Sequence, residues 1–219
     1  MTASATTIRK FIHEDVFDYQ TLIAILGNYS SPRDKISRLI RNGDIIRIKK
    51  GLYIFNDDLR KKPIPLMYLA NLLHGPSYVS LEYALQHYAL LSEHVVEITS
   101  VTTGRSKRYT TPVGHFSFQH IPLSCFTPGM DLFTDDSGNS CLIAVAEKAL
   151  VDKINAGPQL RTNKDMKRYL FDDLRLNLSD LKQLNLKLIE KYCTAYGTKK
   201  SELLLQVIKS NQKELSFKK

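Results

Sequence analysis

A charged, proline-containing segment interrupts this chain of 219 residues. Residues 56–65 have the sequence NDDLRKKPIP, in which five side chains are charged and two residues are proline. The charges keep the segment in water, and proline cannot extend a helix or a sheet ladder. Because 219 residues are enough for two small hydrophobic cores, we expect an N-terminal domain at residues 1–62 and a second domain at residues 63–219.

Helices and a hairpin are predicted ahead of this segment. Residues 8–12 suit a short first helix. The second helix has apolar side chains at positions 22, 23, 25 and 26 and is predicted to end at Gly27-Asn28. Residues 45–55 are rich in β-branched and aromatic side chains on both sides of Lys50-Gly51, which is typical of a β-hairpin with its turn at that pair.

A third helix is predicted between them, at residues 32–42. Ser31 suits the N-cap position, Pro32 the first helical position, and Asp34 places an acidic side chain in the first turn. Gly43 suits the left-handed conformation that commonly ends a helix. The first 55 residues therefore have the order helix, helix, helix, hairpin.

The third helix has an apolar side and a polar side. Ile36, Leu39 and Ile40 form a stripe that is expected to face the domain core. Residues 31–62 contain ten basic side chains against four acidic ones, which is +6 of the chain's net charge of +9. Such clustering favours a winged helix-turn-helix across residues 8–55 that binds double-stranded DNA. The polar side of the helix carries Arg33, Lys35, Ser37, Arg38, Arg41 and Asn42.

We assign the DNA contacts to Arg33, Lys35, Ser37, Arg38, Arg41, Arg47, Lys49 and Lys50. Arg33 and Ser37, near the start of the helix, are the candidates for reading bases, while Arg38 and Arg41 are expected to hold phosphates. Lys49 and Lys50 are placed at the turn of the wing, with Arg47 on the same strand face as Lys49. Two alternatives stay open: a solvated basic helix beside an unrelated hairpin, and a winged helix that binds protein.

Beyond the break, helices and strands alternate without any repeat. This pattern predicts an α+β fold with helices at both ends of a small sheet. The expected helices lie at residues 65–73, 80–91, 144–154, 163–173, 179–195 (with a break near Asn185) and 199–213, and the expected strands at residues 95–103 and 115–121.

Three segments have the order and spacing of a known family's motifs. Residues 41–53 end in KKGLY, residues 77–85 read SYVSLEYAL, and residues 143–152 read IAVAEKALVD. Together they resemble the AbiEi family of antitoxins from bacterial type IV toxin–antitoxin systems. In this sequence Ala146 stands where the family pattern has proline, and Tyr83 where it commonly has serine.

The resemblance implies a bacterial transcriptional repressor that binds operator DNA upstream of its own gene. It also implies a C-terminal domain that counteracts a nucleotidyltransferase-like toxin encoded beside it, with no need for a stable complex between the two proteins. On this basis we expect an autoregulating antitoxin that is not an enzyme and needs no cofactor.

The alternative function is a Mg²⁺-dependent nuclease that a winged helix directs to DNA. Glu147, Lys148 and Asp152 are the residue types that such chemistry uses. Glu147 and Asp152 are five residues apart on a predicted helix and do not share a face well, so we expect them to cap or salt-bridge a surface helix instead. The histidines and cysteines lack metal-ligand spacings, so we assign no catalytic residue and no metal site.

The chain is expected to be cytoplasmic, with no membrane partner. Residues 1–10 lack the apolar core of a signal peptide. The apolar stretches fall far short of the roughly 18 residues that a membrane span needs. Cys125, Cys141 and Cys193 are odd in number and far apart, which fits reduced thiols in the cytosol.

Overall fold

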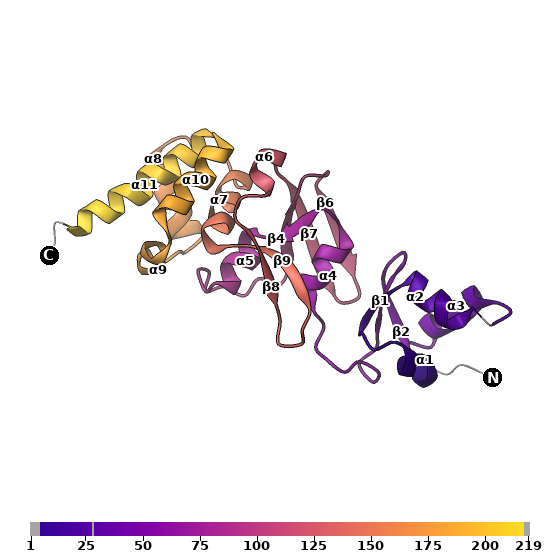
Figure 1. Ribbon diagram of the computed structural model, residues 1–219. Helices are drawn as coiled ribbons and strands as arrows, with labels where there is room; N and C mark the ends of the chain where they lie inside the picture. The colour runs from indigo at the N-terminus through magenta and orange to yellow at the C-terminus, as the bar shows by residue number, and fades with distance from the viewer. Residues whose placement is uncertain (1–4, 28, 217–219) are drawn as a thin grey trace. The chain divides into compact units, whose positions relative to one another are not determined.

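The computed structural model describes residues 5–27 and 29–216 (Figure 1). The chain has a mixed α+β fold and divides into two compact units. Unit 1 consists of Met1–Ile64 together with Thr110–Val113, and unit 2 of Pro65–Tyr109 together with Gly114–Lys219. The division after Ile64 falls inside the charged, proline-containing segment.

The described residues of unit 1 form three helices and a small antiparallel sheet. The sheet has the strand order β1-β3-β2, so β3, the last of the three along the chain, lies in the middle. In chain order the elements are α1 (Ala5–Phe11), β1 (Val16–Asp18), α2 (Tyr19–Leu26), α3 (Pro32–Arg41), β2 (Ile45–Lys49) and β3 (Leu52–Phe55). The predicted first helix begins three residues earlier than expected, and β1 was not predicted because three residues give too short a pattern.

The core of unit 1 lies between its helices and one face of the sheet. Phe17 of β1 and Phe55 of β3 pack with ring centroids 4.6 Å apart. Each large apolar side chain removed from water stabilises the unit by roughly 1.5–3 kcal/mol. The buried residues of this cluster are Ile8, Ile12, Phe17, Leu22, Leu26, Ile36, Leu39, Ile45, Tyr53 and Phe55.

The ends of α2 and α3 follow their capping residues. Asp18 accepts a hydrogen bond from the Thr21 backbone nitrogen at 2.8 Å, which satisfies a free N–H at the start of α2. Ser31 occupies the N-cap position of α3 as predicted, but its hydroxyl donates to the Asp34 carboxylate at 2.5 Å instead of accepting from the backbone. Gly43 has φ +76°, which confirms the left-handed turn after α3. The predicted stop of α2 includes Asn28, which lies outside the described residues.

A buried ion pair holds the charged segment against the rest of unit 1. The Arg9 guanidinium lies 2.7 Å from the Asp15 carboxylate, and both side chains are buried. Asp15 also accepts hydrogen bonds from the backbone nitrogens of Lys61 and Lys62, each at 3.1 Å. The backbone just before Pro63 is therefore fixed, even though its own side chains are exposed.

Unit 2 is built on a six-stranded mixed sheet with the order β6-β7-β5-β4-β9-β8. The β4–β9 and β5–β7 pairs are parallel, whereas the β4–β5 and β8–β9 pairs are antiparallel. Its strands are β4 (Ser77–Val79), β5 (Ile98–Thr102), β6 (Lys107–Thr111), β7 (Gly114–His120), β8 (Met130–Thr134) and β9 (Ser140–Ala144). Its helices are α4 (Leu66–Leu73), α5 (Leu81–His87), α6 (Leu123–Phe126), α7 (Ala146–Ala156), α8 (Asn163–Arg168), the π-helix η1 (Tyr169–Asp173), α9 (Leu178–Gln183), α10 (Leu186–Tyr196) and α11 (Lys199–Ser216).

The sheet is larger than the sequence predicted. The two expected strands are present as β5 and β7, whereas β4, β6, β8 and β9 are additional. Of these, β4 is only three residues long and β6 is highly charged, so neither gives a clear strand pattern. The predicted break near Asn185 is confirmed, since it separates α9 from α10. Among the described residues, no helix combines the length and apolar character that crossing a bilayer requires.

Helix α7 occupies the centre of the helical part of unit 2. It packs against α5, α10 and α11, and the later helices gather beside it in Figure 1. Its buried residues include two charged ones, Lys148 and Asp152. The expectation that residues 144–154 form a surface helix is therefore wrong, because helices distant in sequence cover it.

Candidate nucleic-acid interface

The exposed side of α3 presents hydrogen-bond donors. Arg33 and Ser37 are exposed and lie one helical turn apart, and the Ser37 hydroxyl donates to the Arg33 backbone oxygen at 3.0 Å. Ile36 and Leu39 are buried on the other side, as predicted. Ile40 is only half-buried, because it packs against the core at the margin of the open side.

A β-bulge in the hairpin decides which basic side chains share a face. Arg47 pairs with Tyr53 and Lys49 pairs with Leu52, so one extra residue lies in β2 between these pairs. Consecutive residues of β3 point to opposite faces of the sheet. Arg47 and Lys49 therefore lie on opposite faces, and the prediction that they share a face is wrong. The extra residue, Ile48, is buried.

The start of α2 is attached to the turn of the hairpin. The Tyr19 backbone nitrogen donates a hydrogen bond to the Gly51 oxygen at 3.0 Å. Gly51 has φ +87°, a conformation that glycine adopts without strain. This attachment holds the Tyr19 side chain beside the turn.

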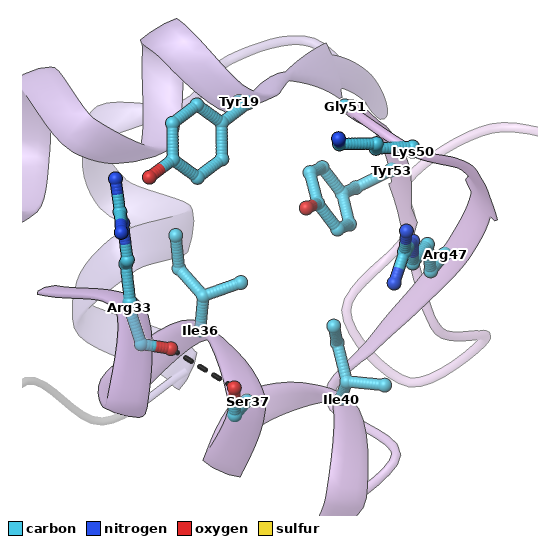
Figure 2. Close-up of a pocket in the computed structure, with 9 residues that line it drawn as sticks. All are labelled: Tyr19, Arg33, Ile36, Ser37, Ile40, Arg47, Lys50, Gly51 and Tyr53. Atoms are coloured by element: carbon cyan, nitrogen blue, oxygen red, sulfur yellow. Dashed lines mark hydrogen bonds between the residues drawn. The ribbon is translucent and has the colours of Figure 1, made fainter.

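Helix α3, the hairpin and the start of α2 enclose an open groove of about 690 Å³. Figure 2 shows the Lys50 ammonium and the Tyr53 hydroxyl pointing into this space, with Ile36 and Ile40 along the α3 side. The Tyr19 hydroxyl points toward the side of the groove that Arg33 occupies. The lining residues are Tyr19, Arg33, Ile36, Ser37, Ile40, Arg47, Lys50, Gly51 and Tyr53.

The groove is positively charged. Arg33, Arg47 and Lys50 line it and are exposed, and none of the nine described lining residues is acidic. Each remaining polar side chain ends in a hydroxyl, which can donate a hydrogen bond. A groove of this composition suits an anionic ligand that brings several acceptor oxygens.

The structure brings together four of the eight predicted contact residues, namely Arg33, Ser37, Arg47 and Lys50. Arg38 and Arg41 are exposed on the outer side of α3 but do not line the groove. Lys35 is half-buried and lies about 160° around the helix from Ser37, at 100° per residue. Lys49 lies on the other face of the hairpin.

Sequence reasoning missed Tyr19 and Tyr53 as residues of this groove. Tyr19 begins α2 and Tyr53 lies in β3, so local pattern gives each an ordinary structural place. Tyr53 lies two residues after the Lys50-Gly51 turn, and a tyrosine has an apolar ring with a polar tip. That position is the only signal in the sequence that the tip lies beside the basic side chains.

Unit 2 contains a second polar cluster, which is buried. Lys148 is 1% exposed and Asp152 is 0% exposed, and the two form an ion pair along α7. Asp152 also accepts hydrogen bonds from the Ser80 hydroxyl at 2.8 Å, the Tyr78 hydroxyl at 3.1 Å and the Tyr196 hydroxyl at 2.6 Å. Burial raises the pKa of both tyrosines far above the ordinary value, and the Asp152 charge raises it further. Both therefore stay protonated and donate to Asp152.

This cluster joins the two segments of unit 2 on which the family resemblance depends. Tyr78 and Ser80 belong to the first, and Lys148 and Asp152 to the second. The Lys148 ammonium and the three hydroxyls all pair with Asp152 inside the unit, so the geometry indicates a structural role. Removing one partner of a buried ion pair such as this lowers the free energy of unfolding by several kcal/mol.

Glu147 does not join Asp152. It accepts a hydrogen bond from the Asn185 backbone nitrogen at 2.8 Å, just before α10 begins. The two carboxylates of the nuclease alternative therefore point to different surroundings. Among the residues that the structure describes, no three His, Cys, Asp or Glu side chains form a group that could hold a metal ion.

Comparisons with known proteins add no further identification. No protein family model matches the chain, and no curated protein is significantly similar to it.

Proposed function

We propose that unit 1 is a winged helix-turn-helix that binds double-stranded DNA, with α3 as the recognition helix and the β2–β3 hairpin as the wing. The observation that carries this proposal is the groove between those two elements, which three cations line from both sides. The order of helices and strands in unit 1, and its three-stranded antiparallel sheet, also support it.

The arrangement suits the two kinds of contact that DNA offers. The exposed side of α3 carries hydrogen-bond donors for base edges in the major groove, and Arg33 and Ser37 are the side chains we assign to them. Arg38 and Arg41 continue that side and are assigned to phosphates. In this arrangement the backbone of one DNA strand passes between α3 and the wing, where Arg47 and Lys50 neutralise its phosphates.

The first test is binding to the region upstream of the protein's own gene. Titration of a fluorescent duplex at several salt concentrations is expected to give a logarithmic salt dependence of about −0.9 per phosphate contacted. The triple variant Arg33→Ala/Arg47→Ala/Lys50→Ala is expected to lose most of this binding while melting at the wild-type temperature, since all three side chains are exposed. Binding that does not respond to salt, or no binding, would contradict the proposal.

The resemblance to AbiEi antitoxins extends the proposal to unit 2. The two resembling segments pack together through Asp152 in one buried cluster of unit 2. We propose that this unit counteracts a nucleotidyltransferase-like toxin encoded beside the gene, as a binding or regulatory protein and not as an enzyme. The protein would then repress its operon through unit 1 and protect the cell through unit 2.

This extension is tested with the toxin expressed from an unrelated promoter. The wild-type chain and the Arg33→Ala/Arg47→Ala/Lys50→Ala variant are both expected to relieve growth arrest, because neither alters unit 2. Failure of both, with the proteins present at equal amounts, would refute the antitoxin role and leave DNA binding untouched.

A further inference from the structure

The hydroxyl of Tyr53 points into the groove although the residue belongs to the core of unit 1. The Tyr53 side chain is only 5% exposed, and its ring stacks on Phe17 with centroids 6.3 Å apart and planes 20° apart. The hydroxyl nevertheless reaches the groove, as Figure 2 shows. Among the described residues no hydrogen bond to this hydroxyl is found, and its oxygen is not one of the buried polar atoms that lack a partner, so it is open to water in the groove.

In the free protein such a hydroxyl donates its hydrogen bond to water in the groove, and a ligand oxygen can take the place of that water. The exchange favours an acceptor that carries negative charge, because hydrogen bonds to charged acceptors are the stronger ones. The ring cannot turn away, because it is part of the core of unit 1. The hydroxyl therefore stays directed at the groove, where a ligand oxygen can accept its hydrogen bond.

The neighbouring side chains define the chemistry of that acceptor. Arg47 is the cross-strand partner of Tyr53, and Lys50 precedes it by three residues at the turn. Arg33 and the Tyr19 hydroxyl line the opposite side. All of these can donate, and three carry positive charge, so the ligand supplies both negative charge and several acceptor oxygens. A phosphate group has these properties.

We propose that Tyr53 binds one phosphate of the DNA backbone where a strand passes between α3 and the hairpin, with the Tyr53 hydroxyl donating to a non-bridging oxygen and Arg47 and Lys50 neutralising its charge. This inference rests on the proposed DNA binding and names a contact within it. Because a phenol is neutral, its hydrogen bond strengthens binding without releasing a counterion. Tyr53 therefore contributes to affinity but not to its salt dependence.

The test compares Tyr53→Phe with Lys50→Ala in the full-length chain on the upstream duplex. Tyr53→Phe removes one hydroxyl and is expected to weaken binding about tenfold at every salt concentration, with the salt slope unchanged. Lys50→Ala is expected to reduce the magnitude of the slope by about 0.9. Tyr29→Phe is the matched control, because Tyr29 packs against the same core but does not line the groove, and it is expected to bind as the wild type does.

A duplex with one neutral methylphosphonate identifies the phosphate. At the position that Tyr53 contacts, the methylphosphonate and Tyr53→Phe are expected to weaken binding together by less than the product of their separate effects. Inorganic phosphate alone, at matched ionic strength, is expected not to shift the Tyr53 ring resonances at millimolar concentration. A shift of those resonances that saturates at millimolar inorganic phosphate would overturn the inference in favour of a free-anion site.

The outcomes separate this inference from the function beneath it. If the wild type binds DNA and Tyr53→Phe binds equally well, with both folded by circular dichroism, the Tyr53 contact is refuted and DNA binding stands. If the wild type does not bind DNA, the proposed function itself fails.

Discussion

The groove of unit 1 and the buried cluster of unit 2 place their cations in opposite surroundings. In unit 1, Arg33, Arg47 and Lys50 stand in water around an open groove that contains no acidic side chain among its described residues. In unit 2, Lys148 is removed from water and meets the charge of Asp152. The same type of side chain is thus available to an external anion at the groove and is paired internally in the buried cluster.

The difference teaches that burial, and not residue type, assigns these charges their role. An exposed cation contributes little to the free energy of folding because water and salt screen it, so it stays available to bind an anion. A buried cation is expensive to desolvate and is tolerated only when its partners satisfy it. Clustered positive charge in a sequence indicates binding only where the fold leaves it exposed.

The largest expected effect comes from breaking the buried cluster. Asp152→Ala leaves the Lys148 ammonium buried without its counter-charge and removes the acceptor of three hydroxyls. The free energy of unfolding is expected to fall by about 3–5 kcal/mol, measured by urea denaturation. Lys50→Ala is the control and is expected to stay within about 0.5 kcal/mol of the wild type. Equal stability of the two variants would show that burial does not separate the two sets of cations.

The next effect concerns the assignment of base contacts to α3. Arg33→Ala is expected to reduce the preference for the upstream site over a scrambled duplex by roughly 1–3 kcal/mol, if the guanidinium pairs with a guanine edge. Competition binding against both duplexes measures this difference. An equal loss on both sequences would instead make Arg33 a backbone contact.

A smaller effect distinguishes the two lysines of the β2–β3 hairpin. Because Lys50 lines the groove and Lys49 lies on the other face, Lys50→Ala is expected to change the salt slope by about 0.9 and Lys49→Ala by clearly less. Both losses should be similar on all DNA sequences, since a wing mainly meets the backbone. If Lys49→Ala had the larger effect, the face of the hairpin assigned to DNA would be wrong.

The smallest effect compares an exposed carboxylate with Asp152. The backbone N–H and then the hydroxyl of Thr21 lower the pKa of Asp18 by hydrogen bonding to its carboxylate. A lowered folded-state pKa means that the stabilisation is present above the unfolded value of about 4 and is lost as the pH falls through the folded value. Asp18→Ala is expected to cost about 0.5–1 kcal/mol at pH 7, and less in acid. A difference that persists unchanged at pH 2 would show that the charge of the cap does not contribute.

The sequence alone was sufficient for features that depend on near neighbours. The N-cap position of Ser31, the left-handed Gly43 and the turn at Lys50-Gly51 are confirmed, because each depends on the backbone preferences of a few adjacent residues. The burial of Ile36 and Leu39 followed from helical spacing. The mixed α+β class followed in the same way from the alternation of local patterns.

Only the tertiary structure decided which side chains act together. The bulge at Ile48 separates Arg47 from Lys49, and the packing of the hairpin beside α3 brings Tyr53 to a groove that no local pattern reveals. Asp152 is buried because α10 and its Tyr196 cover α7, although they lie more than 30 residues further along the chain. Local propensity acts over one or two turns of chain, whereas burial and charge partners depend on contacts between segments far apart in sequence.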